Sequence, residues 1–385
     1  MVKKGKNWQF WPGWMGCLSL GCGLAIAACE PDPSPPPSDP QVLQEQIEEG
    51  LVLENATLEQ SDEEGRILWK VNAEKAIYTQ DKKLVRLENI KGDLYQDGEV
   101  VMQVTSKSGD IEQDSQIIRL HEDIVGIDPR NQAIFKGQEL EWRPQEDMAI
   151  ISEDVSGQND NLEVKAQIGR YFSRTQQMQL EGKVAAIAKD PPLQIKTEAV
   201  TWDIENKTVN SEVKVTINRY DQKTITDRVV ADKGNVNLAN KIVTLTNNVE
   251  LKATEPPLQI ASNQAIWNVE ARTVRSPQPI QVIHLAEKFT VTGNQGFIDL
   301  EDQIARFEGG IHGISAKQQA NLYADSLVWE IPKQLLNARG NVAYNQNDPP
   351  LDLTGQQATA KLEAQSVKIA SSDRTGRVTT HITPR

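Results

Sequence analysis

Apolar and polar residues alternate with a period of two over most of the chain from Leu51 onward. Val243-Thr-Leu-Thr and Phe289-Thr-Val-Thr show this alternation clearly, and it is typical of half-buried β-strands. Turn-forming pairs such as Asp97-Gly98 separate the alternating segments. Past residue 50 no segment keeps a helical apolar period over several turns, and only Gln41 to Glu49 predicts a short helix. The sequence therefore predicts an all-β fold.

A longer period overlies this alternation, because an apolar residue recurs at nearly even spacing, with one longer interval between Val213 and Val249. The series, which Ile124 precedes at the same spacing, consists of Val155, Val184, Val213, Val249, Ile280, Ile311 and Val342. Similar sequence surrounds its members, as in 234–249 and 296–311. Repeats of this size bury their apolar faces only by stacking on their neighbours. We predict an elongated stack of half-units of about 31 residues, which suits binding along its length better than a compact catalytic pocket.

Tryptophans mark a period twice as long. Trp142, Trp202, Trp267 and Trp329 recur at almost equal spacing on similar strand-like segments. Paired prolines at 191–192, 256–257 and 349–350 follow the same frame and predict corners between layers, because they cannot lie in a central strand. These four tryptophans, Trp69 and the seven recurring aliphatic residues are the candidate lining of the interior. Two arrangements stay open, a filled core and a groove whose apolar side chains face a lipid.

The segment that ends at Cys29 has the pattern of a lipoprotein signal peptide. Lysines precede an apolar stretch that ends in Ile26-Ala-Ala-Cys29, with small residues before a cysteine that becomes acylated. We predict a signal peptide over 1–28 and a lipid anchor on Cys29, followed by a proline-rich linker over 29–50. Glu30 favours retention at the inner membrane. An uncleaved helical anchor is the alternative, although the apolar stretch is shorter than the ~20 residues that span a bilayer.

Composition narrows the classes of partner. The net charge of −13 argues against nucleic acid and anionic membrane surfaces as partners, and it otherwise serves solubility. All three cysteines, at positions 17, 22 and 29, lie at or before the predicted cleavage site. The mature chain is therefore expected to contain neither a disulfide framework nor a cysteine-based metal site.

No catalytic constellation is found in the sequence. The four histidines, at positions 121, 284, 312 and 381, lie far apart, and none has metal-ligand spacing. The chain lacks a nucleophile elbow, an H-E-x-x-H motif and a phosphate loop. Acidic runs such as Asp62-Glu-Glu64 are expected to be solvated, and Asp299-Leu-Glu-Asp302 lacks the glycine and the spacing of a calcium loop. We therefore expect no enzyme activity, no cofactor and no bound metal.

Several segments between Leu51 and about Val155 carry a resemblance to a known family. They are 53–60 (Leu-Glu-Asn-Ala-Thr-Leu-Glu-Gln), 65–78, 85–95, 108–110 and 140–142. Together they resemble the LptC family, the periplasmic component of the lipopolysaccharide-export ABC transporter. Later units, such as 231–238, are similar to repeats shared by LptA and the N-terminal part of LptD.

The resemblance implies a twisted β-jellyroll, open along one side, whose apolar interior receives lipid acyl chains. It also implies edge-to-edge stacking with LptA-like or LptD-like jellyrolls, and with the periplasmic jellyrolls of the transporter's permease subunits. Exposed edge strands are templates for such pairing. The predicted function is therefore transfer of lipopolysaccharide or a related glycolipid across the periplasm toward the outer membrane, by a protein held at the inner membrane through Cys29.

Two departures from the family are expected. A lipidated cysteine replaces the spanning helix of well-known short members, and the chain is about twice their length. We divide the body into an LptC-like jellyroll over 51–187 and additional LptA-like repeats over 188–385, as one long jellyroll or two in tandem. An alternative function is that of a structural envelope lipoprotein whose β stack binds glycan or protein. A third, an enzyme acting on envelope polysaccharide, needs a cleft with converging carboxylates.

Overall fold

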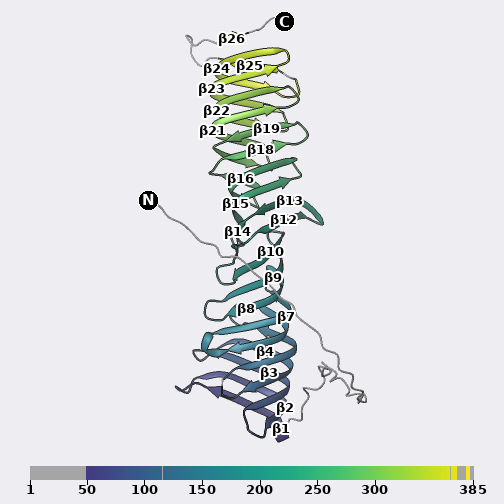
Figure 1. Ribbon diagram of the computed structural model, residues 1–385, viewed down its shortest axis with the longest axis vertical. Helices are drawn as coiled ribbons and strands as arrows, with labels where there is room; N and C mark the ends of the chain where they lie inside the picture. Colours follow the sequence, from purple (N-terminus) through teal and green to yellow (C-terminus); the bar gives the residue numbers. More distant parts are fainter. Residues whose placement is uncertain (1–48, 115, 365, 371–378, 382–385) are drawn as a thin grey trace, which may run out of the picture. The chain divides into compact units, whose positions relative to one another are not determined.

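The structure is a computed structural model that describes residues 49–114, 116–364, 366–370 and 379–381. The predicted signal peptide, Cys29 and almost all of the linker and the short helix lie outside the described residues. Glu48–Arg385 forms one compact unit. Within it, the alternating segments of the sequence form antiparallel strands, and the predicted all-β fold is confirmed (Figure 1).

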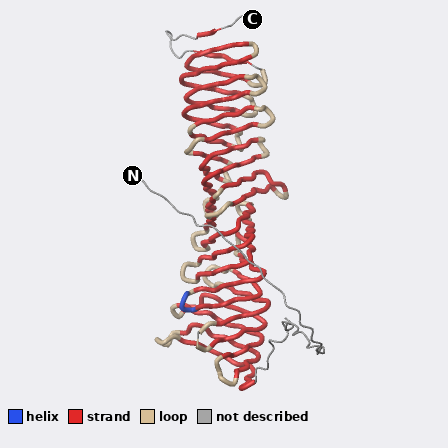
Figure 2. Tube along the Cα trace, viewed as in Figure 1, coloured by secondary structure: helices blue, strands red, loops and turns tan. Residues whose placement is uncertain are grey.

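The strands follow one another along the chain, and each pairs with strands close to it in sequence (Figure 1). The first ten are β1 (Glu49–Ser61), β2 (Ile67–Thr79), β3 (Leu84–Gln96), β4 (Glu99–Glu112), β5 (Ile118–Ile127), β6 (Ile134–Arg143), β7 (Met148–Gln158), β8 (Leu162–Phe172), β9 (Gln177–Ala188) and β10 (Leu193–Asp203). The next ten include several short strands: β11 (Thr208–Ser211), β12 (Val215–Asp221), β13 (Thr224–Ala231), β14 (Lys233–Asn237), β15 (Ile242–Ala253), β16 (Leu258–Asn268), β17 (Thr273–Ser276), β18 (Ile280–His284), β19 (Phe289–Gly293) and β20 (Gln295–Asp299). The last six are β21 (Ile304–Ser315), β22 (Ala320–Glu330), β23 (Leu335–Asn347), β24 (Pro350–Lys361), β25 (Ser366–Ala370) and β26 (Thr379–His381). The single helical element among the described residues is the 3₁₀ turn η2 (Pro144–Glu146), drawn in blue in Figure 2.

Long strands bend near their middle, and in β10, β15, β16 and β21 the two halves pair on one side with two different short strands. In β15, residues 242–246 pair with β14, whereas residues 250–253 pair with β13. Two consecutive residues with positive φ, Asn247 and Asn248, lie at this bend and shift the register. Such an insertion bends a strand and increases its twist. The half-strands therefore form two walls that meet along a line of bends.

We call these two layers wall A and wall B. Wall A contains five short strands in full, which are β12, β13, β18, β19 and β26. It also contains the first halves of β2, β4, β6, β8, β10, β16, β22 and β24. These pair with the second halves of β1, β3, β5, β7, β9, β15, β21 and β23, which belong to wall A as well. Wall B contains the opposite halves together with β11, β14, β17, β20 and β25. One side chain in two on each wall is buried, so the core lies between the walls.

The paired prolines lie in the turns between neighbouring strands of wall A, at 191–192 between β9 and β10 and at 256–257 between β15 and β16. Pro349 likewise lies between β23 and β24, and Pro350 begins β24. The boundary that we drew between residues 187 and 188 falls inside β9, whose last residues pair with both β8 and β10. Strand pairing is therefore continuous across that boundary.

Candidate functional site

The space between the walls is the candidate site, and its lining is apolar along the described strands. Eleven of the twelve residues predicted to line the interior are at most 3% exposed. They are Trp69, Trp142, Val155, Val184, Trp202, Val249, Trp267, Ile280, Ile311, Trp329 and Val342. A single hydrophobic cluster contains all of them. The structure thus brings together residues that the sequence related only by spacing.

Most of the recurring aliphatic residues have the same place in the fold, directly after a bend. Val249 follows the positive-φ pair Asn247–Asn248, and Ile311 follows Gly309–Gly310. Ile124, Val155, Val184 and Val342 follow equivalent pairs. Each is therefore the first buried residue of the half-strand in wall A that leads away from the line of bends. The repeat seen in the sequence is thus the length of chain from one bend to the next bend of the same kind.

Val213 does not belong to this row. It is 41% exposed, whereas Val215 is 2% exposed and begins β12. Thr197 pairs with Val184 on one side and with Val215 on the other, as Ser262 pairs with Val249 and Ile280. Val215 therefore occupies the position for which we selected Val213.

The turns of wall A and the turns of wall B meet along a line that we call the seam, on the side away from the bends. Polar contacts cross the seam at several levels of the described structure. Among them are those that join Arg174 Nη1 to Asp97 Oδ2 (2.9 Å), Arg130 Nη2 to the Ser173 carbonyl (3.0 Å), Asn131 Nδ2 to Gln176 Oε1 (2.8 Å), Lys241 Nζ to Asp190 Oδ1 (3.1 Å), Arg272 Nη2 to the Glu255 carbonyl (2.8 Å), Gln334 Nε2 to Glu287 Oε1 (3.3 Å) and Gln318 Nε2 to the Leu362 carbonyl (2.9 Å). The side that the resemblance implies to be open carries this seam, so contacts between the two walls hold it together in this structure.

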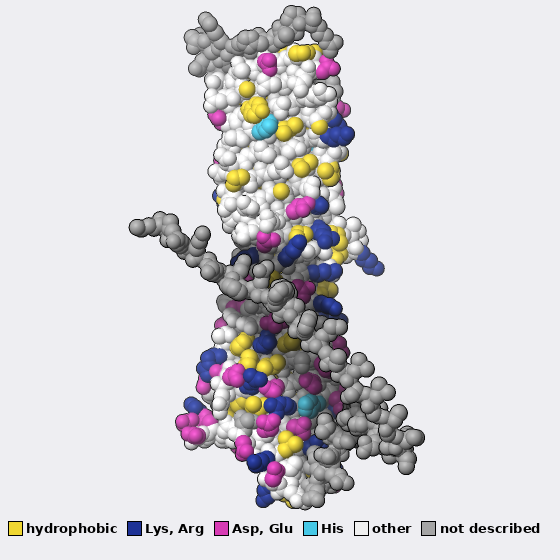
Figure 3. Space-filling view, viewed as in Figure 1, with side chains coloured by type: hydrophobic (Ala, Val, Ile, Leu, Met, Phe, Trp, Pro, Cys, Tyr) yellow, Lys and Arg dark blue, Asp and Glu magenta, His cyan; other side chains and the backbone are white. Residues whose placement is uncertain are grey.

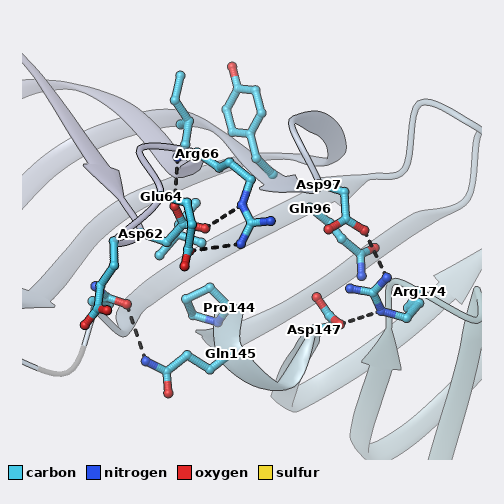
Figure 4. Close-up of a pocket in the computed structure, with 14 residues that line it drawn as sticks. Asp62, Glu64, Arg66, Gln96, Asp97, Pro144, Gln145, Asp147 and Arg174 are labelled. Atoms are coloured by element: carbon cyan, nitrogen blue, oxygen red, sulfur yellow. Dashed lines mark hydrogen bonds and ion pairs between the residues drawn. The ribbon is translucent and has the colours of Figure 1, made fainter.

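The N-terminal part of the seam contains a polar cavity of about 430 Å³ (Figure 4). Arg174 lies between Asp97 of wall A and Asp147 of wall B, at 2.9 and 2.8 Å (Figure 4). These two carboxylates raise the pKa of the Arg174 guanidinium, with Asp147 the larger influence. Asp62 and Arg66, in the turn between β1 and β2, form a second ion pair in the same cavity. Four carboxylates of the cavity, Asp62, Glu64, Asp97 and Asp147, are therefore held in ion pairs by these two arginines.

A buried network joins the walls near β8. The Asp128 carboxylate is fully buried and accepts hydrogen bonds from Arg130, at 2.6 and 3.0 Å, and from the Tyr171 hydroxyl. Burial and the Asp128 charge raise the pKa of the Tyr171 phenol, so Tyr171 stays a neutral donor. A buried carboxylate needs such partners because an unpaired buried charge is costly. This network fixes the turn at 128–133 against β8.

Aromatic rings also cross the interior beneath the seam. The Trp329 ring of wall B lies 5.0 Å from Phe289 and 5.8 Å from His284, both of wall A. Phe135 and Tyr171 make a similar contact at 4.7 Å. Edge and tilted contacts of this kind favour close packing of aromatic side chains. Trp329, which the sequence related to the other tryptophans by spacing, therefore packs against the opposite wall.

The exposed surface shows no continuous apolar trough on the face seen in Figure 3, where hydrophobic side chains form separate groups. The interior that the buried residues line is thus filled by their own side chains in this conformation. The two end strands are different. In the described structure β1 pairs only with β2, and its Leu51 is 51% exposed, with Val52 and Leu53 also exposed.

The described residues offer few features suited to other chemistry. They include no group of three or more His, Cys, Asp or Glu side chains that could hold a metal ion. They also contain no helix with the length and hydropathy needed to cross a bilayer. His121 contacts Asp110 at 3.3 Å, and His312 stacks on Tyr323 at 4.5 Å. Neither arrangement places a nucleophile beside a base.

The seam does not stand out in the sequence. Four of its wall B residues, Gln176, Lys241, Arg272 and Gln334, belong to a regular series of polar residues with positive φ, which is Gln176, Lys207, Lys241, Arg272, Gln303 and Gln334. The members of this series are almost evenly spaced along the chain, at the same interval as the buried aliphatic residues. A search for recurring long polar residues directly before the apolar segments would have found this series. Its partners on wall A, Asn131, Asp190, Glu255 and Glu287, recur at about the same interval or twice that interval.

Two comparisons with known proteins bear on the site. A family model described as "Lipopolysaccharide-assembly, LptC-related" matches residues 18–167, 135–221 and 218–316. Successive matches overlap and together span most of the chain, from residue 18 to residue 316. No curated protein matches the chain.

Proposed function

Because the chain belongs to the LptC-related family of lipopolysaccharide-assembly proteins, we propose that its folded part carries lipopolysaccharide or a related glycolipid across the periplasm. The acyl chains would lie between walls A and B. Members of this family take part in lipopolysaccharide transport as periplasmic components tied to the inner membrane, rather than as enzymes. The predicted resemblance to the family is confirmed.

The observation that carries the proposal is the continuity of the apolar interior in a member of this family. The hydrophobic cluster runs from β1 to β24 without a polar layer that divides it. Acyl chains favour such an interior by about 25 cal/mol per Å² of apolar surface removed from water. The recurring buried aliphatic residues, such as Val249, Ile280 and Ile311, offer an acyl chain similar apolar environments at successive positions along the interior. A lipid can then move stepwise, since no single position binds it much more tightly than the next.

The filled interior requires the walls to separate when a lipid enters. Side chains occupy the space at packing densities that leave no room for an acyl chain. Parting the walls breaks the polar contacts of the seam, of which those between exposed groups contribute only about 0–1 kcal/mol each. It also breaks the buried Asp128 network and the aromatic contacts between the walls. On the opposite side the two walls stay joined, because the chain runs from one wall to the other through each bend. We therefore propose that the walls hinge at the bends and part at the seam.

Photo-crosslinking tests the proposed function directly. A benzophenone amino acid at Ile280 or Ile311 should capture lipopolysaccharide in cells, because both side chains face the interior. The matched control is the same amino acid at Val213 or Leu285, which are exposed. Capture at the exposed positions alone, or at none, would remove the lipid-carrier proposal.

The closed seam also favours the second candidate function, a structural envelope lipoprotein whose β stack binds glycan or protein. A sealed core is what that function needs. The two candidates differ in whether the walls part. The two functions can be distinguished by replacing the seam residues Lys241 and Asp190 with cysteines and crosslinking them. If the protein is a lipid carrier, the crosslink should abolish lipid capture at Ile311. If it is a structural protein, the crosslinked chain should stay fully functional in cells.

The proposal extends to partners and anchor. Exposed edges at β1 and at β24 to β26 suit pairing with the jellyrolls of permease subunits and of LptA-like or LptD-like proteins by main-chain hydrogen bonds. An acylated Cys29 would hold the chain at the inner membrane. A crosslinker at Val52, whose side chain is exposed on β1, should capture a transporter subunit. A Cys29→Ala variant should lose the incorporated lipid label.

A further inference from the structure

The polar contacts across the seam leave a gap near the middle of the described chain. The contact between Asn131 and Gln176 lies on one side of this gap, and the ion pair between Asp190 and Lys241 lies on the other. Between them, the wall A turn at 159–161 faces the wall B turn at 204–207. No hydrogen bond or ion pair between those two turns is found in the described structure.

A cavity of about 480 Å³ occupies this gap, and we call it the Trp202 cavity. Its apolar floor is formed by Trp202, Ile204 and Leu238. Its rim is polar and comes from both walls: Arg130, Asn131, Asn159, Asp160, Asn161, Gln176, Glu205 and Lys207. Amide and carboxylate side chains accept hydrogen bonds, and amides and cations donate them, so the rim suits a ligand rich in hydroxyl groups. The volume lies within the range of ordinary ligand pockets.

The Trp202 ring separates this cavity from the interior. It packs over Gly157 of wall A, where an added Cβ would lie 3.4 Å from Trp202 Cζ3 and 3.5 Å from Phe135 Cδ1. The absence of a side chain at Gly157 gives the indole room to cross from wall B to wall A. Trp202 is itself 1% exposed and belongs to the hydrophobic cluster. Trp202 is therefore the part of the cavity floor that lies against the opposite wall, and its displacement would open a path beside Ile204 and Leu238 into the interior.

We propose that the Trp202 cavity is a side opening through which acyl chains reach the interior, and that its rim holds the sugar part of the glycolipid. This inference rests on the proposed function. An amphiphile needs an apolar path next to a hydroxyl-binding rim, and the described seam offers both here, where no polar contact between the facing turns must break. Lys207 forms no ion pair in the described structure, so it is free to pair with an anionic group on the sugar part.

The test uses the full-length chain and purified lipopolysaccharide. A benzophenone amino acid is placed at Leu238, in the cavity, or at Ile311, in the interior. The cavity is then filled by the double substitution Asn161→Trp and Glu205→Trp, both at exposed rim positions. The matched control is Arg228→Trp with Arg275→Trp, at two exposed strand positions outside the cavity. Unchanged thermal unfolding verifies that both doubles fold.

The filled cavity should lower the rate of capture at Ile311 at least about tenfold, and the control double should leave it unchanged. Deacylated lipopolysaccharide, which retains the sugars alone, should compete with capture at Leu238 and, because it occupies the opening, should also lower the rate of capture at Ile311. Normal capture at Ile311 in the filled variant overturns the side opening and leaves the proposed function intact. Failure of deacylated lipopolysaccharide to compete at Leu238 overturns the sugar-binding rim. Absence of capture at Ile311 in the unmodified chain instead overturns the proposed function.

Discussion

At the scale of single residues, the row of buried aliphatic side chains depends on hydroxyl groups that end the short strands. Thr197 Oγ1 contacts Ser211 Oγ at 2.9 Å, and Ser262 Oγ contacts Ser276 Oγ at 2.8 Å in the next full unit of the repeat. Ser211 donates to the Val213 carbonyl, as Ser276 donates to that of Gln278. Val213 is therefore the equivalent of a glutamine in an exposed loop. This equivalence explains why Val213, although it is apolar and fits the spacing, does not lie in the interior.

The first prediction compares two valines separated by one residue. Val215→Ala removes two buried methyl groups and should lower the free energy of unfolding by about 1–3 kcal/mol. Val213→Ala removes exposed methyl groups and should change it by less than about 0.5 kcal/mol. Denaturant unfolding of both variants measures the difference. Equal effects would mean that Val215 does not occupy the interior row.

The second prediction concerns His284, which is buried beside Trp329. Burial lowers the pKa of its imidazole, opposed by the nearby Glu287 and reinforced by Lys317. Its Nδ1 accepts a hydrogen bond from the Glu287 backbone N–H at 3.2 Å, which also requires the neutral ring. The unfolded chain, with a histidine pKa of about 6.5, binds the proton more readily than the folded chain. Stability should therefore stay constant well above pH 6.5 and fall as the pH drops from about 6.5 toward the lower pKa of the folded state.

The variant His284→Gln should flatten this dependence, since a single histidine contributes at most about 1.4 kcal/mol per pH unit. His312→Gln, on the outer face against Tyr323, is the matched control. Thermal unfolding at several pH values provides the measurement. An unchanged slope in the His284 variant would show that another group titrates in this range.

At the scale of elements, the pair of positive-φ residues at each bend decides where a strand divides between the walls. Gly309 and Gly310 have φ values of 71° and 58°, and Gly340 and Asn341 have 77° and 46°. Side chains disfavour this conformation, so glycine and asparagine are suited to it. The strand segments themselves follow from the alternation that the sequence displays. Because this alternation is visible in the sequence, the strands could be predicted from it, and they are confirmed.

The third prediction tests the bend. Gly310→Ala should destabilise the fold by about 1–2 kcal/mol through its backbone conformation, because the nearest side-chain atoms to an added Cβ lie at 3.5 Å or more. Asn341→Gly, at an equivalent bend with φ 46°, should be neutral or stabilising. Denaturant unfolding compares the two. A neutral Gly310→Ala would contradict the role assigned to the positive-φ pair.

At the scale of the whole folded unit, each strand pairs mainly with its neighbours in the chain, as in stacked repeat proteins. Stability in such a stack is nearly a sum of local and nearest-neighbour contributions. The end strands have fewer partners: β25 and β26 are short, and each pairs only with β24 in the described structure. The central strands β15 and β16 pair along almost their full length.

The fourth prediction follows from this arrangement. Amide hydrogens of β25 should exchange much faster than those of β15 and β16, because end strands open without unfolding the rest. Hydrogen exchange followed by mass spectrometry measures the gradient. Uniform protection along the chain would indicate a single cooperative unit.

The candidate site was predictable only in part. Ten buried residues of the interior were identified from spacing, because the repeats place equivalent residues at equivalent positions, and Trp69 was identified beside them. The Trp202 cavity was not, since its rim combines turns of both walls, such as those at Asn131 and Lys207. Those residues are polar, and polar turn residues have no pattern that distinguishes a rim from an ordinary turn.

By itself, the sequence determined the all-β class, the repeat length and the face of each strand that is buried. Alternation and turn residues act over a few neighbouring positions, so they can be read without the fold. The tertiary structure alone decided that the two walls meet at a seam. Arg174 and Asp97, which join across it, are 77 residues apart in the sequence. Only the pairing of every strand between them brings the two side chains together, and with them closes the interior.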